Sequence, residues 1–252
     1  MIDVFLEVIT GSSLYPLEDG RELMRLLEEL VPEWMPARWG HDEPLRRTYT
    51  PELLEEAWSD ELMWKGAGAR ANGMIFRPRG PRERYGAIVL AADSSDVDVS
   101  RAVALLERLG LAFDGVYGFF HRVTRRDLVG AGPNSVEYLA SDEANLFVPE
   151  IQLRRWLPDL YWGNLLGPPY VELFGRERIE SAPAYTVKQV GPDLYYLQLS
   201  ERLEDLRDRW DEVDAVRAAV KQHLGANAFW DPALGEDHAY DVPAFASPPA
   251  PR

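Results

Sequence analysis

Apolar residues recur along the chain with two periods, and these periods predict where strands and helices lie. Helical spacing of leucine and valine predicts helices at residues 17–30 and 99–109, which end near Pro32 and at Gly110. Apolar runs and alternation predict a first strand, a pair of strands and two further strands, at residues 2–9, 62–69, 71–78, 85–91 and 113–123. Residues 34–47, rich in proline, tryptophan and charge, are expected to form an ordered loop.

Helix-start signals in the first half come from short polar side chains and proline. Thr50 as N-cap and Pro51 at the first helical position predict a short helix through Trp58. Either Asp96 or Asp98 is expected to cap the helix near residue 99. The order strand, helix, strands, helix, strand predicts an α+β fold, with helices packed on the face of an antiparallel or mixed β-sheet.

In the second half, a predicted hairpin precedes the longest predicted helix. Segments 184–190 and 194–199 flank Gly191-Pro192-Asp193, a sequence typical of a hairpin turn. The apolar residues of segment 201–224 fall on one stripe and predict a continuous helix that ends at Gly225. Residues 124–160 are less regular, with a surface turn expected at residues 130–134.

No confident domain boundary is evident. We expect one α+β domain at residues 1–240, with two sub-halves, 1–125 and 150–240, as the alternative. Residues 241–252 hold four prolines and are expected to form a frayed or polyproline-like tail.

Residues 161–175 combine glycines, adjacent prolines and aromatics, and they predict a loop that leads into a short helix. Glycine permits backbone angles closed to other residues, and proline suits the first turn of a helix. Gly175 is the expected helix stop. We expect aromatic side chains to pin this structural motif in the core: Trp162, Gly163, Asn164, Gly167, Pro168 and Tyr170.

Composition narrows the class of protein. The chain has 252 residues, of which 46% are hydrophobic, and its lack of cysteine excludes disulfides and thiolate metal sites. Neither a signal peptide nor a long apolar segment is visible, so a cytoplasmic protein is expected. A net charge of −15 repels nucleic acid and anionic membrane and attracts basic proteins, although it also fits a protein that is merely very soluble.

Candidate catalytic chemistry is sparse. His121 alternates with aromatics in a predicted strand and is expected to be a satisfied polar group, while His238 lies in an acidic loop whose spacing matches no metal motif. The segment Asp93–Asp98 resembles a cation loop but lacks the glycine and distal glutamate of one, so capping is the expected role. No nucleophile elbow or phosphate loop is present. We therefore expect no catalytic residue, no metal and no cofactor.

Acidic residues before residue 99 and along segment 201–224 are the candidates for partner binding. On the long predicted helix, neighbouring arginines neutralise part of the charge of the acidic residues, a pattern that is typical of a solvated face. The acidic residues nevertheless outnumber the arginines there. Asp208 and Asp211, three residues apart, are expected to point the same way. The candidate contacts are Asp96, Asp98, Glu204, Asp205, Asp208, Asp211 and Glu212.

One block of motifs resembles a known family. It comprises Trp162-Gly163-Asn164, Leu166-Gly167-Pro168, Tyr170-Val171-Glu172 and Ser181-Ala182-Pro183, followed by a tyrosine-rich strand and the helix of segment 203–224. Across residues 155–225 the chain resembles bacterial polymorphic-toxin immunity proteins, specifically the immunity protein 52 family and related type VI secretion immunity proteins. The resemblance implies an α+β protein that neutralises a toxin by direct binding, in some members a toxin of restriction-endonuclease-like fold. It implies no catalytic residue.

The expected function is therefore that of a non-enzymatic immunity protein that binds and neutralises a cognate bacterial toxin. A nuclease fits well, because its cleft must attract phosphate and an acidic inhibitor gains steering against a basic cleft. Two alternatives are a small-molecule-binding sensor that uses the aromatics, and an enzyme with a cation at the Asp93–Asp98 loop.

Overall fold

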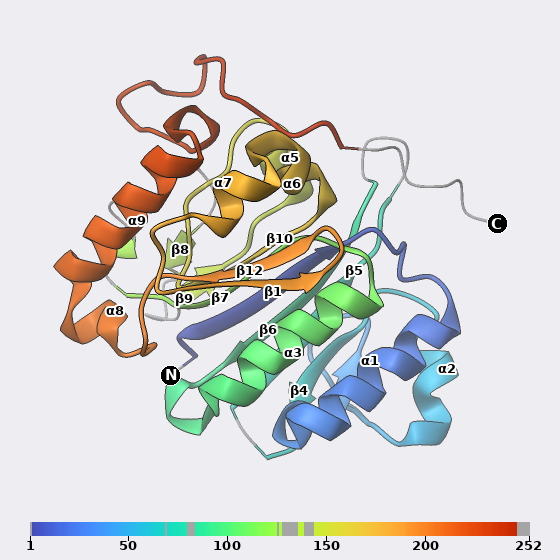
Figure 1. The fold of residues 1–252 in the computed structure, drawn as a ribbon. Coiled ribbons are helices and arrows are strands. Elements are labelled where there is room, and N and C mark those ends of the chain that lie inside the picture. Colours follow the sequence, from blue (N-terminus) through green and yellow to red (C-terminus); the bar gives the residue numbers. More distant parts are fainter. Residues whose placement is uncertain are drawn as a thin grey trace.

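The computed structural model describes residues 2–68, 70–79, 84–124, 126–127, 136–138 and 144–245. Its main element is a ten-stranded sheet (Figure 1). The strands are β1 (Val4–Thr10), β2 (Pro36–Gly40), β3 (Arg47–Thr48), β4 (Met63–Gly66), β5 (Ala71–Phe76), β6 (Gly86–Ala92), β7 (Gly115–Arg122), β10 (Gly163–Leu166), β11 (Thr186–Gly191) and β12 (Leu194–Gln198). A separate pair is formed by β8 (Val136–Tyr138) and β9 (Ala144–Leu146).

The strand order of the large sheet is β11-β12-β10-β7-β1-β6-β5-β4-β2-β3, and every pairing in it is antiparallel. The predicted α+β class is therefore confirmed, with the antiparallel alternative realised. Because β7 pairs with β10, one sheet contains strands from both halves of the chain.

Helices cover both faces of this sheet. They are α1 (Leu17–Leu30), η1 (Pro32–Trp34), η2 (Pro51–Leu53), α2 (Leu54–Ala57), η3 (Ser94–Asp96), α3 (Val99–Ala112), α5 (Glu150–Leu153), α6 (Pro168–Phe174), α7 (Arg176–Glu180), α8 (Asp205–Asp208), α9 (Trp210–Leu224) and η4 (Ala226–Ala228). Among the described residues, no helix is long and apolar enough to cross a bilayer.

The helices α3 and α6 lie on opposite faces of the sheet. A Cβ added at Gly118 of β7 would lie 3.2 Å from Leu106 of α3. The adjacent residue, Tyr117, has its ring centroid 5.7 Å from that of Tyr170 in α6. Since neighbouring residues of a strand point to opposite faces, the two helices are separated by the sheet. The helix α1 lies beside α3 (Figure 1).

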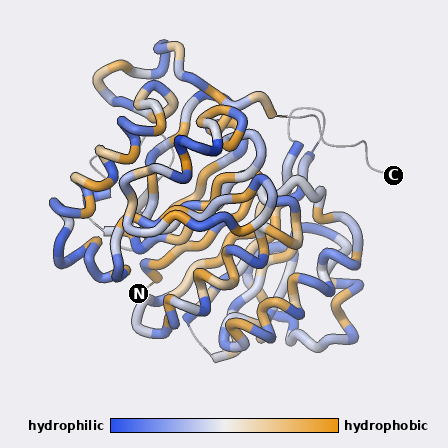
Figure 2. The backbone as a smooth tube through the Cα atoms, viewed as in Figure 1, coloured by the Kyte–Doolittle hydropathy of each residue, from blue (hydrophilic) through white to orange (hydrophobic). Residues whose placement is uncertain are grey.

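The central strand β1 explains why the first apolar run is continuous. It lies between β6 and β7, and all seven of its residues are buried. A strand covered on both faces needs apolar residues on both sides, so it lacks the alternation of a half-exposed strand. Figure 2 shows hydrophobic residues along the central strands, and alternating hydrophobic and hydrophilic residues along α1 and α3.

The predicted helix at residues 17–30 is confirmed as α1, and Asp98 is the cap of α3. Its carboxylate accepts the N–H groups of Ser100 at 3.0 Å and Arg101 at 3.2 Å. Gly110, however, does not end this helix. It is buried inside α3, where a Cβ would lie 2.4 Å from Leu165, so glycine is required there for close helix–strand packing.

Two other predictions in the first half need correction. The expected loop at residues 34–47 contains β2 and part of β3, with Pro36 as the first residue of a strand, a position that proline tolerates. The short helix after Thr50 consists of η2 followed by α2, and Thr50 makes no side-chain capping bond although Pro51 occupies the first turn.

The predicted helix at residues 201–224 is two helices. The chain leaves helical geometry at Arg209, with φ −136° and ψ 38°, and α9 begins at Trp210. Asp208 and Asp211 therefore lie in different helices, so their three-residue spacing no longer supports the expectation that both point the same way. Periodicity failed to reveal this break because the apolar spacing is helical on both sides of it.

The stretch at residues 161–175 is a strand followed by a helix. Gly175 ends α6 with φ +81°, as predicted. Gly167 is extended, with φ −90° and ψ −172°, so its need for glycine is steric: an added Cβ would lie 2.1 Å from the carbonyl oxygen of Gly115. Gly163 also has no positive φ; a Cβ there would meet the hydroxyl of Tyr196 at 2.8 Å.

The C-terminal tail is packed against the body at its start. Phe245 has ring contacts with Tyr85 and Tyr170, at centroid distances of 5.7 and 6.2 Å. Phe245 is therefore not frayed, and residues 246–252 lie outside the described residues. The expected surface turn at residues 130–134 also lies outside them.

Replacing Gly167 with alanine should destabilise the fold, because the new methyl group would collide with the backbone of β7. We expect a loss of about 1–3 kcal/mol in the free energy of unfolding, typical of overpacking. Gly68→Ala is the control, since its methyl would meet nothing nearer than Glu33 at 3.6 Å. Urea denaturation of both variants measures the difference, and equal stabilities would contradict this role for Gly167.

Candidate functional site

The structure brings some of the predicted acidic contacts to one end of the sheet, around the start of β1 (Figure 1). Asp3 accepts hydrogen bonds from the backbone N–H and the hydroxyl of Ser94, at 2.8 and 2.9 Å, and pairs with Arg122 at 2.8 Å. A hydrogen bond from Arg207 is the main cause of the lowered pKa of Asp208, with smaller contributions from Arg202 and Arg122. Asp208 and the Asp93–Asp98 loop therefore flank the same strand end.

Most of these candidate contacts already have partners. Asp98 caps α3, Asp208 pairs with Arg207 at 2.7 Å, and Asp211 pairs with Arg126 at 2.9 Å. Glu204 lies 3.5 Å from Arg202, and Glu212 accepts a hydrogen bond from Arg209 at 3.0 Å. Asp96 forms no ion pair with a described residue. Exposed pairs add little stability, but they reduce the local negative field that a partner would meet.

Asp205 does not belong to a solvated face. Its exposure is 6%, and its carboxylate accepts the backbone N–H of Arg202 at 3.2 Å. It also lines a pocket of about 190 Å³ at the α8–α9 break, together with Glu201, Arg209 and Glu212. Because Arg209 pairs with Glu212 there, the pocket contains its own countercharge.

The predicted structural motif around Trp162 is built from buried hydrogen bonds. His121 accepts the backbone N–H of Trp162 through Nδ1 at 3.1 Å, and its Nε2 lies 3.2 Å from Asp127. Asn164 donates to the carbonyl of Tyr161 at 2.7 Å and accepts its N–H at 2.8 Å. His121 is thus a satisfied polar group, as predicted, and these bonds position β10 between β7 and β12.

Glu7 is a buried carboxyl group that sequence reasoning missed, although its place inside an apolar run was a signal. It is 0% exposed, with Oε2 accepting the N–H of Val148 at 2.9 Å and Oε1 making no hydrogen bond with a described residue. Burial raises its pKa well above the usual value of a glutamate. Raised carboxyl pKa values occur in active sites. Glu7, however, has no exposed surface to offer a substrate.

The other candidates for metal chemistry are engaged in ordinary contacts. His238 Nε2 lies 2.7 Å from Asn227, and Asp93 accepts the N–H of Ser95 at 3.1 Å to cap η3. Across the part of the chain that the structure describes, no three histidine, aspartate or glutamate side chains converge as a metal site would require.

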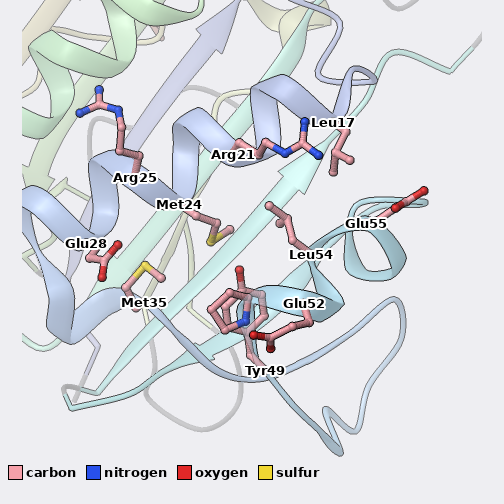
Figure 3. Close-up of a pocket in the computed structure, with 11 residues that line it drawn as sticks. Leu17, Arg21, Met24, Arg25, Glu28, Met35, Tyr49, Glu52, Leu54 and Glu55 are labelled. Atoms are coloured by element: carbon pink, nitrogen blue, oxygen red, sulfur yellow. The ribbon is translucent and has the colours of Figure 1, made fainter.

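A groove of about 390 Å³ lies between α1 and the η2–α2 segment, and Figure 3 shows its lining. We call it the α1–η2 groove. Its apolar lining comprises Leu17, Met24, Met35, Tyr49, Pro51 and Leu54. Its charged lining comprises Arg21, Arg25, Glu28, Glu52 and Glu55. None of these residues was predicted as a contact, because the groove joins two segments that are separate in the sequence.

The electrostatics of the α1–η2 groove are acidic. Arg21 is paired with Glu18 at 3.1 Å, and Arg25 with Glu22 and Glu29, each at 2.6 Å. Neither Glu28 nor Glu55 forms an ion pair with a described residue. The pKa of Glu52 is lowered by the Thr50 hydroxyl. The pKa of Tyr49 is raised by burial and then by the charges of Glu28 and Glu52.

No family model and no curated protein matches the sequence. Among solved structures, the chain is similar to a Pseudomonas aeruginosa T6SS protein, PA0821, with a TM-score of 0.51 and 11% identity. The match covers 92% of this chain and 85% of the other. At this identity the likeness shows a shared fold.

Glu7→Gln should stabilise the protein at neutral pH. A carboxyl whose pKa is raised by folding contributes stability below its unfolded pKa and loses it as pH rises toward the folded pKa, at about 1.4 kcal/mol per pH unit. Glutamine does not ionise, so the free energy of unfolding of the variant should rise relative to that of the wild type as pH increases above about 4.5. Unfolding measured from pH 4 to pH 8 gives this difference, and a pH-independent difference would contradict a neutral Glu7 in the folded state.

Proposed function

We propose that this protein is a non-enzymatic immunity protein, which binds and neutralises a cognate bacterial toxin. The observation that carries the proposal is the fold shared with a T6SS protein across 92% of the chain. The immunity-like motif around Trp162 supports it, because the motif supplies core contacts and no reactive group. In this proposal the protein acts in the cytoplasm as a single binding domain at residues 1–240.

The proposed partner is a basic toxin, and a nuclease domain fits best. A net charge of −15 attracts a basic surface from a distance and disfavours nucleic acid as a ligand. An inhibitor of a nuclease gains specificity by offering carboxylates to a cleft that has evolved to hold phosphate. The same charge would not speed the association of this protein with a neutral toxin.

Two acidic regions are available for this contact. One is the strand-end region, with Asp96, Asp98 and Asp208, which the sequence identified. The other is the α1–η2 groove, whose Glu28 and Glu55 lack an intramolecular ion pair among the described residues. The cation-enzyme alternative has less support, because Asp93 and Asp98 of its loop serve as helix caps.

Association with the toxin should slow strongly as salt is added, whereas dissociation should change little. The Debye length falls from roughly 30 Å at 0.01 M to about 8 Å at 0.15 M salt, which screens long-range steering but not desolvated central contacts. Stopped-flow measurements with the toxin domain encoded beside this gene give both rates, with an expected drop in association of about tenfold or more.

Growth rescue provides the cellular control for this prediction. Co-expression with the toxin domain should restore growth, and the complex should survive gel filtration at physiological salt. Failure of both would contradict the immunity proposal.

A further inference from the structure

The lining of the α1–η2 groove suits the binding of a side chain from another protein. Met24 and Leu54 are buried beneath it, while Met35 and Tyr49 are half-buried along it. Methionine side chains adapt to the shape of an incoming group, and a tyrosine ring offers a flat face. Figure 3 shows Met24, Met35, Leu54 and Tyr49 around one common space between the two segments.

Two carboxylates line the groove from its two walls. Glu28 comes from α1 and Glu52 from η2, both are exposed, and Figure 3 shows Glu52 close to the Tyr49 ring and Glu28 on the α1 side, beside Met35. The Tyr49 hydroxyl makes no hydrogen bond with another described residue. Glu55 points away from this space in Figure 3, so the acidic pair that faces an occupant is Glu28 and Glu52.

The two arginines of the groove do not neutralise this pair. Arg21 is held by Glu18, and Arg25 is held by Glu22 and Glu29 on its own helix. The carboxylates of the α8–α9 region, by contrast, are mostly paired with arginines close by. A cation that enters the groove therefore meets carboxylates whose charge no described arginine neutralises, next to apolar surface.

We infer that the α1–η2 groove is the docking site for an arginine side chain on a basic segment of a partner protein. The planar guanidinium can stack on the ring of Tyr49 and donate hydrogen bonds to Glu52, while the charge of Glu28 on the facing helix adds to the attraction. The methylene groups of the same side chain pack on Met24 and Met35. Lysine offers a compact, strongly hydrated charge with no flat face, so it satisfies less of this lining.

This inference rests on the proposed function for the identity of the partner, but its chemistry has a test of its own. The probe is a capped tetra-arginine peptide, titrated into protein labelled with carbon-13 in its methionine methyl groups. Met24 and Met35 should shift, while Met63 and Met74, which lie on β4 and β5 away from the groove lining, should not. Tetra-lysine should bind several times more weakly.

The decisive variant is Glu28→Gln with Glu52→Gln. Both positions are exposed, and glutamine keeps the shape of the side chain, so the fold should persist. The matched control is Glu172→Gln with Glu177→Gln, which removes the same charge from α6 and α7 at exposed positions that form no ion pair with a described residue. We expect the groove variant to weaken tetra-arginine binding and toxin binding by about tenfold, and the control by less than about twofold.

The outcomes separate the groove from the immunity role. Equal effects of the groove and control variants, or peptide shifts spread evenly over Met24, Met35, Met63 and Met74, would overturn the groove as a docking site. Wild-type protein that binds tetra-arginine in the groove but fails to bind the toxin would overturn the proposed function and leave the arginine preference standing. Loss of both peptide and toxin binding in the groove variant alone supports the inference.

Discussion

The pairing of β7 with β10 is the interaction on which the rest of the structure depends. It joins strands from the two halves of the sequence into one antiparallel sheet. Gly167 allows the chain to pass so close to β7 that no larger residue fits, and His121 holds Trp162 at the start of β10. The residues of the structural motif around Trp162 therefore help to join the two halves of the sheet, and their role is architectural.

A sheet covered on both faces moves the partner-binding chemistry to the periphery. The buried carboxyl of Glu7 is fully enclosed, so we expect surface carboxylates to meet a ligand. Where these carboxylates have arginine neighbours, as on α8 and α9, the fold uses their charge internally. The α1–η2 groove differs because Glu28 and Glu52 line it together with apolar side chains and form no ion pair with a described residue. In this account, charge draws a basic partner in and the groove fixes its position.

The sequence allowed prediction of features set by local periodicity, and it failed where tertiary contacts decide. The strand β1 and the turn at Gly191 could be predicted because burial selects a largely apolar segment and a tight turn selects glycine and proline, and both leave a local pattern in the sequence. The predicted role of Gly110 was wrong because glycine is required there by a tertiary contact, the close packing of the helix against Leu165 on the neighbouring strand. The break at Arg209 was missed because two consecutive helices share one spacing. The groove was missed because it forms only when α1 meets η2.

Hydrogen–deuterium exchange of the protein, free and bound to its toxin, tests the central claim most directly. The account predicts that peptides covering Leu17–Leu30 and Pro51–Ala57 exchange more slowly in the complex, while those covering Asp205–Leu224 are unchanged. Backbone amides report local opening and burial without any substitution that could disturb the fold. Protection confined to α8 and α9, with α1 and η2 unaffected, would contradict it.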